Sequence, residues 1–189
     1  SELATAADPL TGTTRTYTWT AGGDLDNVVN GATTRAYAYD GIGRLTGDTL
    51  KNTSTNAVLN AVTYGYDNDG NVTSQVITAT GNTAAGTHTY GYDQAGRLTS
   101  WTGPGGTVNY GYDAAGNRTS VGAAAFTYDQ RNRLLTGDGT NNWTARGDLA
   151  SNVKGGITTN YTYDALGRTT AAGSVTYGYD GLDRVATRT

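Results

Sequence analysis

The chain has 189 residues, a formal net charge of −3 and no cysteine, which excludes a disulfide framework and a thiolate metal site. Its 13 cationic residues are scattered along the sequence, so we expect neither nucleic-acid binding nor attraction to an anionic membrane. With 28 glycines, 14 tyrosines and a single phenylalanine, an ordinary aliphatic core is excluded, and aromatic rings must supply much of the buried surface.

The first predicted element is a lead-in segment, residues 1–16. Residues 17–189 then repeat one unit nine times: two aromatic residues separated by one residue, then Asp, then Gly three residues later. We call the two aromatic residues the first and second aromatic of the repeat. In chain order the second aromatics are residues 19, 39, 66, 92, 112, 128, 143, 163 and 179, and Trp19 and Trp143 take this place in two degenerate copies.

Each unit has the pattern of a β-hairpin. Residues at i and i+2 project from the same face of a strand, so the paired aromatics share one face. The Asp suits the first corner of a type I turn, and the Gly supplies the left-handed residue that closes a turn with a bulge. Leu or Val follows in seven units and can meet an aromatic across the hairpin.

The residues that we expect to build the repeat are the paired aromatics, the Asp and the Gly of the clearest copies. These are Tyr37, Tyr39, Asp40 and Gly43; Tyr64, Tyr66, Asp67 and Gly70; Tyr90, Tyr92, Asp93 and Gly96; Tyr110, Tyr112, Asp113 and Gly116; and Tyr161, Tyr163, Asp164 and Gly167. A second class of Gly-rich turns lies between units, so each unit contributes about two strands. The sequence therefore predicts an all-β fold without helices, a continuous antiparallel meander of about 18 short strands that curls as part of a spiral shell or ribbon.

Candidate catalytic, metal and cofactor sites are few. The repeated Asp residues could be imagined as a Ca²⁺ ladder, but each turn brings only one carboxylate, which favours turn closure. His88 is the single histidine and cannot anchor a zinc site by itself. No nucleophile motif is present. We therefore expect no catalytic, cofactor-binding or metal-binding residues and no enzymatic activity.

The aromatic residues leave a second possibility open. Aromatic faces can stack on sugar rings, although rings packed against neighbouring hairpins explain the same pattern. Trp101 is the one aromatic residue that lies outside the repeat, and it stands beside a Gly-Pro-Gly-Gly turn. It is the best single candidate for a surface contact with a glycan or another partner.

The run Y-x-Y-D-x-x-G-R-L, seen at Tyr37–Leu45 and Tyr90–Leu98, resembles the YD motif of the RHS family, which includes teneurin and insecticidal toxin-complex shells. The resemblance extends from about Tyr17 to Arg184. It implies a β-sheet strip wound into a hollow shell that commonly encloses a C-terminal toxin, or, in animal relatives, that belongs to an adhesion ectodomain.

Three functions follow as hypotheses. The leading one is a non-catalytic shell or scaffold segment of a secreted or cell-surface protein, bacterial in origin, that encloses or presents a toxin or effector domain. Its partners would be the remainder of the parent protein and the enclosed toxin, because a chain without methionine indicates a cleaved product or an excised stretch. The alternatives are a carbohydrate or cell-surface adhesion module and a self-assembling extracellular fibre. We expect no membrane insertion, since no apolar run approaches about 18 residues.

Overall fold

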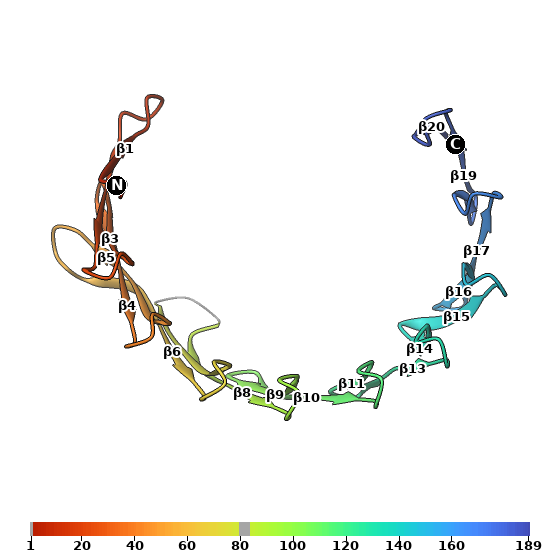
Figure 1. Ribbon diagram of the computed structural model, residues 1–189, viewed down its shortest axis with the longest axis horizontal. Coiled ribbons are helices and arrows are strands. Elements are labelled where there is room, and N and C mark those ends of the chain that lie inside the picture. Colours follow the sequence, from red (N-terminus) through yellow and green to blue (C-terminus); the bar gives the residue numbers. More distant parts are fainter. Residues whose placement is uncertain (1, 80–83) are drawn as a thin grey trace. The chain divides into compact units, whose positions relative to one another are not determined.

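The computed structural model describes residues 2–79 and 84–189, and every helix or strand assigned in these ranges is a strand. Apart from the step from β12 to β13, each strand runs back antiparallel along its predecessor through a hairpin turn (Figure 1). The predicted all-β meander is confirmed. Within the described ranges no helix is long and apolar enough to cross a membrane. The chain divides into two compact units, Ser1–Asn109 and Tyr110–Thr189, which are described separately below.

Unit 1 contains the longer strands. They are β1 (Thr5–Ala7), β2 (Thr14–Trp19), β3 (Leu25–Asn30), β4 (Thr33–Tyr39), β5 (Leu45–Asn52), β6 (Val58–Tyr66), β7 (Val72–Ala79), β8 (Gly86–Tyr92), β9 (Leu98–Gly103) and the first part of β10 (Gly106–Tyr112). In β4 and β6 many residues pair on both sides at once, as Asn60 does with Leu50 and with Ala79. The sheet of unit 1 is therefore wide.

Unit 2 contains the rest of β10 and ten shorter strands. They are β11 (Arg118–Val121), β12 (Ala124–Ala125), β13 (Thr127–Tyr128), β14 (Leu134–Gly137), β15 (Gly139–Trp143), β16 (Leu149–Lys154), β17 (Ile157–Tyr163), β18 (Thr169–Ala172), β19 (Val175–Tyr179) and β20 (Val185–Arg188). Here β17 pairs with β16 through Ile157–Asn160 and with β18 through Tyr161–Tyr163, so each residue of β17 pairs on one side only.

The described residues form 20 strands instead of about 18, for two local reasons. Residues of the lead-in form β1, which pairs with β2. In the sixth repeat the aromatic strand is so short that Phe126 separates β12, which pairs with β11, from β13, which pairs with β14. The meander is interrupted at this point, and the strands form two sheets, β1 to β12 and β13 to β20.

The hairpin turns follow one backbone pattern. In the second repeat the N–H of Asp40 donates to the carbonyl of Arg44 (2.9 Å), and the N–H of Gly43 donates to the carbonyl of Asp40 (3.0 Å). Tyr39 faces Leu45 while Ala38 faces Gly47, so one residue of the return strand bulges out. The position four residues after the second aromatic has a positive φ in all nine repeats, including Asn132 (60°) and Asp183 (61°).

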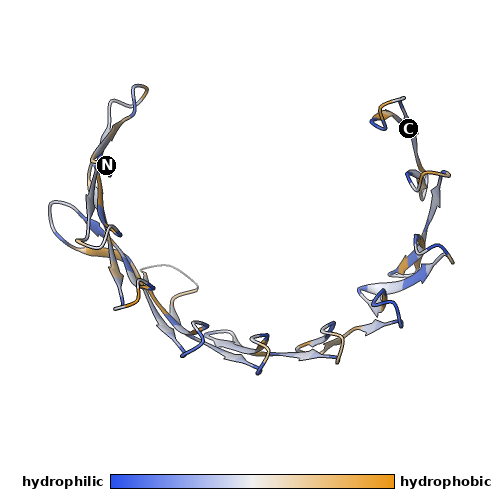
Figure 2. Cartoon of the chain, viewed as in Figure 1, coloured by the Kyte–Doolittle hydropathy of each residue, from blue (hydrophilic) through white to orange (hydrophobic). Residues whose placement is uncertain are grey.

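The rings lie in a half-buried layer and not in a closed core. Among the described residues no hydrophobic side chain is fully buried, and His88 alone is buried, at 7% exposure. The strands are mostly pale in Figure 2 because Tyr, Thr, Ser and Gly have intermediate hydropathy, whereas strong colours gather at the turns. A minor part of each aromatic side chain therefore stays exposed.

Candidate functional site: the aromatic face and the repeat junctions

The repeat Asp closes the turn of its own unit with three hydrogen bonds. Oδ1 of Asp40 accepts from the N–H groups of Ile42 (3.1 Å) and Arg44 (2.9 Å), and Oδ2 accepts from Arg44 Nε (2.7 Å). The same arrangement recurs at Asp93, Asp129, Asp164 and Asp180. Asp suits this place because its side chain can bond to the backbone two residues further on.

These bonds favour the ionised carboxylate and so lower the pKa of the turn aspartates. The side chain of Arg44 is the largest cause at Asp40, and the side chain of Arg133 lowers the pKa of Asp129 to about 2. At Asp67 the amide of Asn71 takes the place of the guanidinium and acts in the same direction. In the described ranges no three His, Asp or Glu side chains gather in a way that could hold a metal ion.

A second kind of hydrogen bond joins one repeat to the next at seven places in the described residues, and we call each of these places a junction. The hydroxyl of Tyr39 donates to the carbonyl of Leu25 (2.9 Å), the residue six positions after Trp19. At six further junctions a second aromatic donates in the same way, at 2.6 to 3.0 Å: Tyr66, Tyr92, Tyr128, Trp143, Tyr163 and Tyr179. The accepting carbonyl is always six residues after the preceding second aromatic. The register between repeats is therefore the same even though their lengths vary.

An arginine extends three of these junctions. The guanidinium of Arg44, already bonded to Asp40, lies 4.6 Å from the centroid of the Tyr66 ring and donates to the carbonyl of Asp67 (3.0 Å). Arg133 lies 5.4 Å from Trp143 and Arg168 lies 4.6 Å from Tyr179 in the same way. A half-exposed contact of this kind contributes about 0.5–1 kcal/mol. One side chain thus connects its own turn with the next ring.

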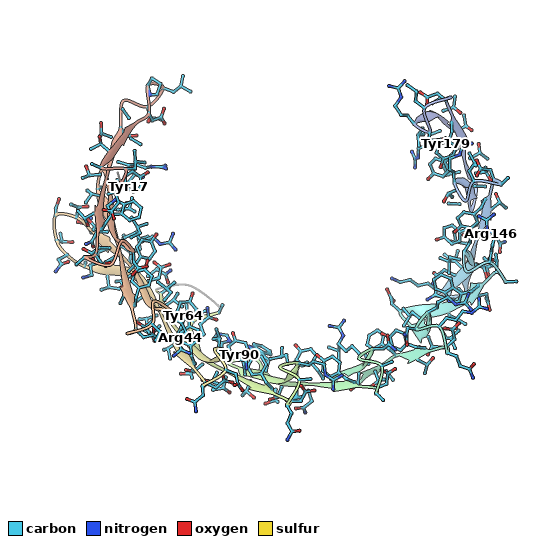
Figure 3. The ribbon with its side chains drawn as sticks, viewed as in Figure 1. Tyr17, Arg44, Tyr64, Tyr90, Arg146 and Tyr179 are labelled. Atoms are coloured by element: carbon cyan, nitrogen blue, oxygen red, sulfur yellow. The ribbon has the colours of Figure 1, made fainter. Side chains whose placement is uncertain are left out.

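The two faces of the sheet differ in chemistry. In unit 1 Tyr17, Tyr64 and Tyr90 project from one face, which we call the ring face (Figure 3). On the opposite face the residue between the aromatics is often Gly and faces a Ser or Thr of the return strand, as Gly91 faces Ser100. A Cβ on Gly91 would lie 2.5 Å from Ser100 Oγ, so this face is slim and hydroxyl-rich.

The family model described as teneurin YD-shell matches residues 13–189. The chain belongs to the teneurin YD-shell family. No curated protein matches it.

Solved structures show the same fold. The YD-shell chain is 20% identical to the crystal structure of TcdB2-TccC3, with a TM-score of 0.55 over 96% of this chain. The corresponding values are 21%, 0.56 and 97% for TcdB2-TccC3-Cdc42, and 20%, 0.54 and 95% for TcdB2-TccC3-TEV. The chain spans only 12 to 13% of the length of those chains.

Trp101 is half-buried in this YD-shell chain, packed against His88. Their ring centroids are 5.8 Å apart at an interplanar angle of 24°, and Trp101 Nε1 donates to His88 Nδ1 (3.2 Å). Because Nδ1 accepts, Nε2 carries the proton and donates to the carbonyl of Ala84 (2.8 Å). Surface contact through the rest of the indole stays a prediction.

The residues predicted to build the repeat are spread along the YD shell instead of meeting in one pocket. Each Asp and Gly lies in its own turn, and each second aromatic lies at its own junction. Sequence reasoning missed the bond from the second aromatic to the previous repeat and the contact of Arg with the next ring. The sequence does contain a sign of the second contact, because an Arg follows the turn Gly in several repeats, as at Arg44 and Arg168. The spacing alone does not indicate which ring this Arg contacts.

Proposed function

We propose that this chain is a non-catalytic segment of the wall of a β-sheet shell, in a secreted or cell-surface protein, and that the shell encloses a toxin or effector domain. The observation that carries the proposal is the recurring junction, at which seven second aromatics of the described residues bond to the preceding repeat. A second aromatic whose hydroxyl donates to the previous repeat, as that of Tyr66 donates to the carbonyl of Leu45 (2.6 Å), has a structural role. The membership in the YD-shell family and the fold likeness to toxin-complex structures support it.

The different chemistry of the two faces favours one of them as the inner surface of the proposed shell. The hydroxyl-rich face, with small residues such as Gly65 opposite Ser74, offers little apolar area to the surroundings. The ring face keeps half-buried tyrosines that a bound polypeptide can cover. We therefore propose that the ring face turns toward the enclosed domain.

Protease protection in the parent polypeptide tests enclosure. The parent is incubated with a protease, and the half-life of its effector domain is compared with that of the isolated effector domain. We expect at least a tenfold longer half-life in the parent, lost when Tyr66→Ala and Tyr163→Ala together weaken the wall. The matched control is the pair Thr63→Ala and Thr162→Ala on the opposite face. An effector domain that is cleaved equally fast in the parent and alone refutes enclosure.

A further inference from the structure

One position of the repeat lies at the floor of two grooves on the ring face. This floor position lies nine residues after the second aromatic and directly opposite the first aromatic. It is Val28 opposite Tyr17, Trp101 opposite Tyr90, and Ala172 opposite Tyr161. Its side chain therefore lies on the ring face between the first aromatics of successive repeats.

The groove is open where the floor residue is small. In unit 1 a groove of about 410 Å³ lies over Val28, with Tyr17 and Tyr37 among its walls and Arg15 and Asn30 also lining it. In unit 2 a groove of about 340 Å³ is lined by Ala172 together with Tyr161, Tyr163, Tyr177 and Tyr179. Each unit thus offers a tyrosine-walled groove at a floor position.

In the fourth repeat the corresponding place is filled by the chain itself. Trp101 takes the floor position of Val28, and its indole extends over Gly103, which corresponds to Asn30. A Cβ on Gly103 would lie 2.5 Å from Trp101 Cζ2 and 2.7 Å from His88 Nδ1. His88, which corresponds to Arg15, stacks on the indole and accepts its N–H. The molecule therefore shows which chemical group this part of a repeat accommodates: a planar aromatic ring with a polar partner at its edge.

We propose that the open groove over Val28 binds an aromatic side chain of a partner polypeptide. The incoming ring would lie on Val28 beside Tyr17, with the exposed guanidinium of Arg15 in the place of the His88 imidazole. The second wall is held in place, because Arg35 pairs with Asp48 and lies 5.7 Å from the Tyr37 ring centroid. Cation–π contact and apolar burial both favour an aromatic over an aliphatic side chain. That the partner is a polypeptide rests on the proposed function, whereas binding of the ring itself does not.

Titration with N-acetyl-tryptophanamide tests the groove on this chain alone. We expect NMR shifts of Val28 and Tyr17 resonances, with a dissociation constant in the roughly millimolar range for so small a ligand. N-acetyl-leucinamide, the matched aliphatic probe, should bind at least fivefold more weakly. Val28→Trp should fill the groove as Trp101 fills its own and reduce binding at least tenfold. Tyr17→Ser, which removes a wall without adding volume, gives a second variant and should also reduce binding at least fivefold.

The reverse substitution completes the design. Trp101→Val should open the part of the ring face that the indole fills in the fourth repeat. The tryptophan probe should then cause new NMR shifts at Tyr90 and Val108, while the shifts at Val28 remain. The proposal is overturned if the tryptophan probe shifts no resonance of the groove, if both probes bind equally, or if Val28→Trp and Tyr17→Ser leave binding unchanged. These outcomes leave enclosure untouched, because the protease experiment on the parent polypeptide reads enclosure independently.

Discussion

The two units build the same repeat with different amounts of sheet. In unit 1, β4 pairs with β5 through seven residues, Thr33–Tyr39, and four of these, Thr33–Ala36, also pair with β3. In unit 2, β19 pairs with β18 through two residues and with β20 through the next three. β17 and β19 thus pass from one neighbour to the next at the place where the aromatic pair begins, whereas residues 151–153 of β16 pair on both sides.

The difference shows what the junction contributes. In the wide sheet of unit 1, ladder hydrogen bonds and junction contacts hold neighbouring repeats together jointly. In the narrow sheet of unit 2, only two residue pairs connect β14 to β15 and β18 to β19, so ring, hydroxyl and arginine must carry a larger share at these two junctions. Matched substitutions in the two units, read by residue-resolved native-state hydrogen exchange, can therefore separate the two contributions.

Removal of a whole junction ring should have the largest effect. Tyr66 and Tyr179 are a matched pair, since their hydroxyls donate to Leu45 (2.6 Å) and Thr169 (2.8 Å). We expect Tyr179→Ala to lower the free energy of unfolding of its unit by about 3 kcal/mol and Tyr66→Ala by about 2 kcal/mol, because β18 and β19 pair through two residues whereas β5 and β6 pair through five. Equal losses at the two sites, measured by hydrogen exchange, would contradict the assigned difference between the units.

The turn glycines come next in size. Gly43 and Gly167 have φ values of 83° and 82°, and a β-branched residue is strained there. Gly43→Val and Gly167→Val should each cost about 2 kcal/mol of unfolding free energy, because a β-branched side chain at a positive φ crowds its own backbone. Gly41→Val is the control, because Gly41 lies in the same turn without a positive φ and has open space around it. If thermal denaturation gives Gly41→Val and Gly43→Val the same melting temperature, the turn does not need its left-handed residue.

The turn was predictable because its determinants are local. Asp40 and Gly43 lie three residues apart, and the residue types that tolerate a positive φ mark the same position even in repeats with Asn132 or Asp183. Alternation of side chains along a strand then placed both aromatics on one face. From these two rules the class of the fold and its strand order follow without knowledge of any distant contact.

The junction could not be read in the same way, because its two partners belong to different repeats. The hydroxyl of Tyr66 donates to the carbonyl of Leu45, 21 residues earlier in the chain. In the seventh repeat the indole N–H of Trp143 takes the place of the hydroxyl and donates to the carbonyl of Leu134, nine residues earlier. Only the register of the strands makes these separations equivalent. Similarly, Trp101 comes into contact with His88 only once β8 and β9 are paired. The sequence alone therefore indicates Trp101 as a candidate surface contact and does not reveal its partner.

Removal of the hydroxyl alone should have a smaller effect that is equal in the two units. Tyr66 and Tyr179 each lie 4.6 Å from an arginine guanidinium, and their hydroxyls donate at 2.6 and 2.8 Å. Phenylalanine at either place keeps the ring and the cation–π contact but leaves a backbone carbonyl without its donor, at a cost of about 1 kcal/mol. Hydrogen exchange should show similar losses for Tyr66→Phe and Tyr179→Phe. A loss confined to unit 2 would mean that the hydroxyl, and not the ring, compensates for the narrow sheet.

The smallest effect per residue should come from protonation of the turn aspartates. Their pKa values are lowered in the folded chain, that of Asp129 to about 2 from an ordinary value of 3.8, so the unfolded chain binds protons first as the pH falls. The stabilisation is complete above about pH 5 and is lost as the pH falls toward 2. Denaturation midpoints of both units should therefore fall between pH 5 and pH 2. Asp129→Asn keeps a hydrogen-bond acceptor but cannot ionise. It should therefore weaken the pH dependence of the denaturation midpoint in unit 2 and leave that of unit 1 unchanged. If the pH dependence in unit 2 stays the same, Arg133 does not favour the charged form of Asp129.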